Sequence, residues 1–437
     1  MSSIASPKRT DAAPHLVAAL PRHVPTAVAI ALFSALMISF TPFQTFDPTQ
    51  PPGGNIVNQL GYGSLGVVSI AALALFATQR VITALLAPSM LALIGFMLLS
   101  VANATDPAAA VRAASFTLIG ILAICTIFAI PRDADAFGDV LGITGLVVTA
   151  VCYAGLVLYP TIAIHTTDSF EPQHAGLWRG VFTHKNIAGP VMACFSFIGL
   201  YLMRRGQRLR GVLLFAAAMV FMLHTGSKTT VGLVPVAMIV VVVPGLFGVR
   251  ALTALMFWAA VIGTALATLG IVFIEPLKHL AAVYAPDLTY TGRVTLWEFS
   301  GEMIRERPWT GYGYESFWMT PFMDSVYQPF DREWDIRAIV HGHNGYLDIA
   351  LIMGLPALAV AVWAFLVAPV IDYLRVPRLT ENVLLGDLCM MILLFTALNA
   401  FLESFFFRRA DPVWLLFVFS LVGLRLAARF PMRTHAA

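Results

Sequence analysis

Long apolar runs alternate with short polar connections along most of the chain. A membrane-spanning helix needs about 17 to 25 mostly apolar residues, and twelve runs approach or reach that length. They cover residues 25–43, 61–78, 81–102, 112–130, 138–160, 186–203, 211–224, 231–249, 251–274, 344–369, 383–402 and 413–428. The pattern therefore predicts an all-α polytopic membrane protein with about twelve transmembrane helices.

One polar segment, residues 275–343, is longer than a connection between packed helices requires. Its portion TGRVTLWEFSGEMIRERP has the spacing of an amphipathic helix, with Val294, Trp297, Gly301 and Ile304 on one face and Pro308 at the end. The stretch PWTGYGYESF then forms a glycine-rich turn. The remainder, from FMDSVYQ to VHGHN, is expected to form short helices or a lid.

The apolar runs and this segment divide the chain into four parts. We expect a cytoplasmic N-terminal tail at 1–24, spans one to nine at 25–274, a periplasmic loop at 275–343, and spans ten to twelve with a cytoplasmic C-terminal tail at 344–437.

Composition supports a membrane protein and excludes other classes. The chain is 59% hydrophobic and 12% charged, whereas soluble domains have roughly 25% charged residues. The net charge of +3 is small and the basic residues are scattered, so nucleic-acid binding is not predicted. All four cysteines fall within apolar runs, which excludes a disulfide framework or a cysteine zinc site.

Basic residues indicate the orientation of the spans, because Lys and Arg accumulate in short cytoplasmic loops. With the N-terminus inside, 15 of the 27 basic residues lie on the cytoplasmic side. The long segment 275–343 then lies outside. Four basic residues on that outer side, Arg179, Lys185, Lys228 and Arg293, are exceptions to the bias and are candidates for binding an anion. The alternative is snorkelling, in which each head group reaches toward lipid headgroups.

The stretch VHGHNGYLDIALIMG places two histidines before the tenth apolar run. Asn344 is a candidate N-cap, and the positive end of the helix dipole disfavours imidazolium at His343. A neutral His343 could accept a proton, although it could equally serve only to cap the helix. His341 and His343 have a spacing that metal sites use, but no further ligands accompany them in the sequence, so no metal is predicted.

Five motifs within about residues 178–358 resemble the O-antigen ligase and Wzy-type polymerase superfamily, and most closely exopolysaccharide polymerases of the ExoQ type. The motifs are RGVFTHKNIAG with Arg179, His184, Lys185 and Asn186; GSKTTVG with Lys228; TGRVTLW with Arg293 and Trp297; PWTGYGYESF with Pro308, Gly311 and Gly313; and His343, Asn344 and Gly354 of the ligase pattern. The last position of that pattern is Ala357 here, a departure that favours a polymerase over a ligase.

The resemblance implies a GT-C-like glycosyltransferase that faces the periplasm from the bacterial inner membrane. Its substrate would be a polyprenyl-pyrophosphate-linked glycan, and it would need neither a metal nor another cofactor. Membrane lipid, chain-length regulators and export proteins would be its partners. The implied roles are catalysis for His343 and Arg293, pyrophosphate binding for Arg179, Lys185 and Lys228, and support from Asn344, His341, His184, Asn186 and Trp297.

Two other functions stay open. A ligase would use the same chemistry to move a finished glycan onto lipid A core or another acceptor. A transporter or flippase of lipid-linked oligosaccharide is also compatible with about twelve spans, but such proteins place ionisable residues near the bilayer midplane. Here these residues gather at the outer ends of the spans, which favours an enzyme.

Overall fold

The computed structural model describes residues 21, 23–44, 55–168, 171–284, 290, 292–326 and 339–434. Within these ranges the secondary structure is helical, with one isolated β-bridge between Ile164 and Trp178. The predicted all-α membrane architecture is therefore confirmed for the part of the chain that the structure describes.

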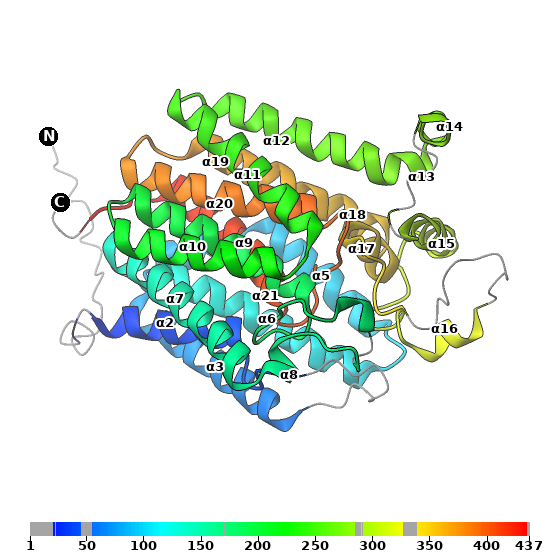
Figure 1. Cartoon of the computed structure of the whole chain (residues 1–437), viewed down its shortest axis with the longest axis horizontal. Coiled ribbons are helices and arrows are strands. Elements are labelled where there is room, and N and C mark those ends of the chain that lie inside the picture. Colours follow the sequence, from blue (N-terminus) through cyan, green and yellow to red (C-terminus); the bar gives the residue numbers. More distant parts are fainter. Residues whose placement is uncertain are drawn as a thin grey trace, which may run out of the picture.

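The membrane domain is a bundle of elongated helices that run side by side (Figure 1). It consists of α2 (His23–Ile38), α3 (Ile56–Phe76), α4 (Gln79–Leu85), α5 (Pro88–Ala102), α6 (Pro107–Ala129), α7 (Ala134–Leu158), α9 (Lys185–Arg204), α10 (Arg208–His224), α11 (Lys228–Leu246), α12 (Arg250–Ala265), α13 (Ile271–Phe273), α18 (Leu355–Val362), α19 (Ala368–Arg375), α20 (Thr380–Asn399) and α21 (Pro412–Arg429). Single π-helical turns join α12 to α13 and α18 to α19.

Nine helical segments among the described residues are long and apolar enough to cross a membrane, or ten if α4 and α5, which are bent by 58°, form one span. Each of the twelve predicted runs contains a helix, but α2 and α10 have only 16 and 17 residues. The multi-pass architecture is thus confirmed, whereas the number twelve stays a prediction.

The three most enclosed spans form the centre of the bundle. Buried residues make up 89% of the apolar stretch of α20, 78% of that of α9 and 72% of that of α21, compared with 28% in α3. A helix that is hydrophobic all round packs inside a bundle, while an apolar helix that is mostly exposed faces lipid. The spans α9 and α20 therefore provide the rigid frame. A connection with candidate site residues precedes α9, and another follows α20.

The segment between α13 and α17 (Gly345–Met353) contains three helices. They are α14 (Glu275–Tyr284), α15 (Arg293–Glu306) and α16 (Pro321–Ser325), and they lie together at one end of the bundle (Figure 1). The predicted amphipathic helix is confirmed as α15, in which Trp297 is fully buried and the helix ends before Pro308. Residues 285–289, 291 and 327–338, which include most of the expected lid, lie outside the described residues.

The tenth predicted span, 344–369, is broken at Gly354. The structure separates the short helix α17 from a span that runs from Leu355 to Arg375. Gly354 has φ of +85°, and a Cβ atom there would lie 2.4 Å from the carbonyl oxygen of Trp309. Only glycine avoids both the left-handed strain and this contact, so the chain changes direction here although its hydropathy is continuous.

The glycine-rich turn fills the break between α17 and α18. Tyr312 N donates to Leu351 O (2.7 Å), Gly313 N donates to Ile352 O (3.2 Å), and Leu355 N donates to Pro308 O (2.7 Å). The last carbonyl groups of a helix lack partners within it, and here the turn supplies donors to two of them. The turn motif and the Gly354 motif thus form one structural unit.

Candidate functional site

The carboxylate of Glu403, in the connection after α20, joins three of the predicted site residues. Its Oε1 accepts hydrogen bonds from Asn186 Nδ2 (3.1 Å) and Arg293 Nη2 (3.0 Å). Its Oε2 lies 3.5 Å from Nδ1 of His343. The start of α9, the start of α15 and the residue before Asn344 therefore converge on one acid.

Glu403 is ionised because its partners outweigh its burial. Burial would raise the pKa of this carboxyl, but the contact with His343 and the fields of Arg293 and His184 lower the pKa of Glu403 to about 2. Arg293 is held further by a hydrogen bond from its Nη1 to Leu402 O (2.6 Å). The pair gives the site a fixed negative charge beside a fixed positive one.

The loop before α17 holds His343 in a left-handed backbone conformation, with φ of +49°. Trp297 Nε1 donates to Gly342 O (3.1 Å), and Gly342 N donates to Asp348 Oδ1 (3.2 Å). Asp348 Oδ1 also accepts from Trp318 Nε1 (2.8 Å). A non-glycine residue persists in this conformation only where its surroundings impose it, so Trp297 and Asp348 position the histidine.

Asn344 is the N-cap of α17, as predicted. Its Oδ1 accepts from the amides of Tyr346 and Leu347, both at 3.1 Å. Its Nδ2 donates to Phe401 O (3.0 Å), and its own amide donates to Ser404 Oγ (3.0 Å). The side chain is fully buried. Asn344 therefore ties the histidine loop to the connection that carries Glu403.

The two histidines of the loop have different surroundings. The ring of His343 is 26% exposed and turns Nδ1 toward Glu403, which leaves Nε2 as the atom available to a substrate. The ring of His341 lies 4.2 Å from that of His343, centroid to centroid, and its Nδ1 accepts from the His343 amide (3.3 Å). Burial and the fields of His343 and Arg408 hold the pKa of His341 well below its ordinary value.

Three of the four predicted anion-binding residues belong to this neighbourhood. Lys185 begins α9 next to Asn186, and its side chain is largely buried. Lys228 begins α11 and is exposed. Glu403, Arg293 and Lys228 are close enough for their fields to act on Lys185. Lys185 and Lys228 therefore place two positive charges beside Arg293 and Glu403.

Arg179 has a different environment. It is 5% exposed, its Nε donates to Ile162 O, and its Nη1 donates to Thr183 O (2.9 Å). Its guanidinium thus fastens the loop between α8 (Pro160–Ala163) and α9. Pyrophosphate binding by Arg179 stays a prediction.

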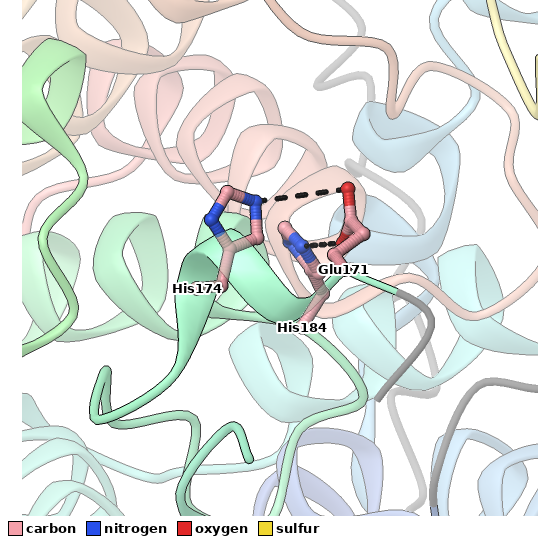
Figure 2. A group of neighbouring side chains, drawn as sticks. All are labelled: Glu171, His174 and His184. Atoms are coloured by element: carbon pink, nitrogen blue, oxygen red, sulfur yellow. Dashed lines mark hydrogen bonds and ion pairs between the residues drawn. The ribbon is translucent and has the colours of Figure 1, made fainter. Parts of the chain in front are cut away.

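A second group of polar side chains, Glu171, His174 and His184, lies on that same loop (Figure 2). His184 caps α9 by accepting from Asn186 N at Nδ1 (3.1 Å), and its Nε2 lies 2.7 Å from Glu171 Oε2. His174, at the end of the 3₁₀ turn η1 (Pro172–His174), places Nε2 3.6 Å from Glu171 Oε1. Among the described residues, this group and the group of His341, His343 and Glu403 have ligand atoms close enough to share a metal ion.

Two acids of these groups were not predicted as site residues. Glu403 stands in LESFFF, between two apolar runs, and an ionisable group at such a place needs a partner. Glu171 stands in a loop with His165, His174 and His184. The position of Glu403 between two apolar runs can be seen in the sequence, but the sequence does not identify the residues with which this acid pairs.

Comparison with known proteins places a family domain across part of this site. Residues 211–362 match the family model described as O-antigen ligase. No curated protein matches the chain. The matched segment contains Lys228, Arg293, His341, His343 and Asn344. The resemblance to the O-antigen ligase and Wzy-type superfamily is confirmed, and closeness to the ExoQ type stays a prediction.

Proposed function

We propose that this chain, which carries an O-antigen ligase domain at residues 211–362, polymerises polyprenyl-pyrophosphate-linked repeat units into exopolysaccharide. The reaction would be an inverting glycosyl transfer at the periplasmic face of the bacterial inner membrane. No step of it uses a metal ion. Family membership supports glycan transfer from a lipid carrier in general, and the choice of polymerisation rests on the Ala357 departure.

The observation that carries the proposal is the convergence of His343 and Arg293 on Glu403, at 3.5 Å and 3.0 Å. A carboxylate beside Nδ1 of a histidine fixes the tautomer with the proton on Nδ1 and stabilises the imidazolium that forms later. Nε2 of His343 is then a proton acceptor. The arrangement combines a general base with a nearby cation. The base can activate the acceptor hydroxyl, and the cation can stabilise the anionic leaving group.

In the proposed step, the hydroxyl oxygen of the acceptor sugar attacks the anomeric carbon of the donor. His343 Nε2 takes the hydroxyl proton as the new glycosidic bond forms. The bond between the anomeric carbon and the pyrophosphate oxygen breaks, and the electron pair leaves with the polyprenyl pyrophosphate. Attack opposite the leaving group inverts the anomeric configuration.

The cations would act on the leaving group. Negative charge grows on the pyrophosphate as its bond to the sugar breaks, and preorganised positive groups stabilise that charge more than they stabilise the bound donor. Lys185 and Lys228 begin two different helices, so the helix dipoles add to their effect. Arg293 completes the set, with its orientation fixed by Glu403.

The experiment is transfer by the purified full chain on a defined lipid-linked repeat unit, followed by product length and anomeric configuration. We expect His343→Ala to reduce the rate by roughly 10² to 10⁴-fold, the usual contribution of general base catalysis. His279→Ala, which removes an exposed histidine from α14, is the matched control and should retain full activity. Undiminished transfer by His343→Ala would contradict the assignment of the base.

Ligase activity is the second candidate, because the matched family carries that description. The same preparation distinguishes the two by the acceptor. A polymerase lengthens the lipid-linked chain in a reaction that contains lipid-linked units only, whereas a ligase forms product only when lipid A core or another acceptor is added. Conversion in detergent would also exclude the transporter, which moves its substrate without changing it.

A further inference from the structure

The loop between α8 and α9 brings three imidazole rings around a common centre. The ring centroids of His165, His174 and His184 are 5.1, 5.4 and 5.8 Å apart, and the ring planes are inclined at 68° to 76°. A tetrahedral ion bound about 2.1 Å from each ring nitrogen would place the centroids of two coordinating imidazoles roughly 5 Å apart. The rings of His174 and His184, 5.4 Å apart, are therefore already spaced as ligands of one ion, and Glu171 completes the group of ligand atoms that could share it.

Glu171 faces two of these rings. Its two oxygens are 2.7 Å from Nε2 of His184 and 3.6 Å from Nε2 of His174 (Figure 2). The longer distance exceeds a hydrogen bond but suits two ligand atoms on one ion. The side chains of His174, His184 and Glu171 are 21%, 24% and 38% exposed, so an ion can reach them from water.

The backbone around the group is held in place. His165 N donates to Leu177 O (2.9 Å), and Gly176 N donates to His165 O (2.8 Å), which closes the loop on itself. His165 Nε2 also accepts from the amide of Lys185 (3.3 Å), which ties the loop to the start of α9. A site whose ligands sit on a fixed scaffold loses little conformational freedom on binding.

We propose that Glu171, His174 and His184 bind a divalent transition-metal ion, for which the two imidazoles and one carboxylate best fit zinc. The bound ion would clamp the loop that carries Arg179 and ends at Lys185. This role is separate from the transfer step at His343.

The other group with ligand spacing, His341, His343 and Glu403, fits an ion less well. Its two rings are only 4.2 Å apart, closer than two imidazoles on one tetrahedral ion. Its carboxylate is also occupied by Arg293 and Asn186. The geometry therefore assigns the ion to the loop before α9.

Metal binding requires one rearrangement. Nδ1 of His184 now accepts the Asn186 amide, so the ring proton is on Nε2, where it faces Glu171. To coordinate through Nε2, His184 must move this proton to Nδ1 and give up the cap of α9. The loss of a single N-cap hydrogen bond is small compared with the binding of zinc to three protein ligands.

The test is zinc binding by the full chain in detergent, after treatment with a chelator and desalting. Zinc is titrated against a fluorescent indicator, and bound metal is counted by mass spectrometry. We expect one equivalent per chain in the wild type, and at least a tenfold loss of affinity in His174→Ala and in Glu171→Gln. Zinc should also raise the unfolding temperature of the wild type but not of these variants.

Two control variants decide the location. His279→Ala removes a histidine that faces Glu275 at 3.5 Å in an exposed pair, and it should bind zinc as the wild type does. His341→Ala should also retain the ion. A wild type that takes up no zinc, or an ion that is lost with His341→Ala but kept with His174→Ala, would overturn the proposal. Neither result would bear on transfer by His343, which is measured separately.

Discussion

The Glu403 carboxylate sets the orientation of His343 and the position of Arg293 at the same time. Glu403→Gln preserves the size of the side chain but removes its charge. We expect the transfer rate to fall by roughly 10²-fold or more, because the histidine loses the group that holds its tautomer. The measurement is the rate of polymer formation from a lipid-linked repeat unit.

Glu298→Gln is the control for this change. Like Glu403, Glu298 of α15 pairs with a basic residue, Lys278 of α14 (2.9 Å), but this pair is exposed. The control variant should leave the rate unchanged. A Glu403→Gln variant with the wild-type rate would show that His343 needs no carboxylate.

Glu403 also makes stability depend on pH. Its folded pKa of about 2 lies below the value of about 4.3 for an unperturbed glutamate. The unfolded state therefore binds the proton more readily, and the stabilisation is complete above pH about 4.3 and is lost as the pH falls toward 2. Thermal unfolding in detergent between pH 6 and 3 should show a smaller decline for Glu403→Gln than for the wild type. Parallel curves would contradict this.

The residues of the site differ in how far the sequence reveals them. Lys185, Lys228 and Arg293 stand out because they are basic on a side that the orientation rule leaves poor in basic residues. His343 stands out at a helix start. Glu403 does not, because its partners lie far from it in the chain and only folding brings them together. The same holds for Arg179, whose binding to backbone carbonyls no pattern of charges foretells.

At the scale of elements, the break between α17 and α18 depends on Gly354. Gly354→Ala forces a side chain into a left-handed position and against the Trp309 carbonyl. We expect a loss of about 2 kcal/mol or more of unfolding free energy. The glycine turn would be displaced, and activity would fall with it. Denaturant unfolding in detergent measures the change.

Gly95→Ala provides the comparison. Gly95 lies within α5, and a Cβ atom there would meet nothing within 4 Å. Alanine favours a helix over glycine by about 1 kcal/mol, so this variant should be as stable as the wild type or more so. Equal losses in the two variants would show that the break needs no glycine.

The elements also show where hydropathy stops being informative. The run 344–369 is mostly apolar and predicts one span, yet the chain breaks at Gly354, where a turn from residues 308–314 packs against it. Periodicity describes neighbours along the chain, whereas this break is decided by hydrogen bonds between segments some forty residues apart. The amphipathic helix α15 is local, and the sequence predicts it well.

At the scale of the whole molecule, the orientation of the bundle is open to a direct test. Lys278 in α14 and Arg210 in α10 are a matched pair of labelling positions, because each is a basic residue that is 50% exposed and forms an ion pair. Lys278→Cys should react with an impermeant maleimide on intact cells, and Arg210→Cys only after permeabilisation. The natural cysteines lie within spans and three of them are buried, so background labelling should be low. The reverse pattern would place the site on the cytoplasmic side.

The contacts of Glu403 also determine when the site can form during synthesis of the chain. Asn186, Arg293 and His343 leave the ribosome long before Glu403, which is followed only by one more span, α21. Until the nascent chain reaches that point, Arg293 lacks the carboxylate with which it pairs in the folded protein. In the proposed mechanism the site is therefore complete only late in translation, and we expect a chain released before residue 403 to be inactive.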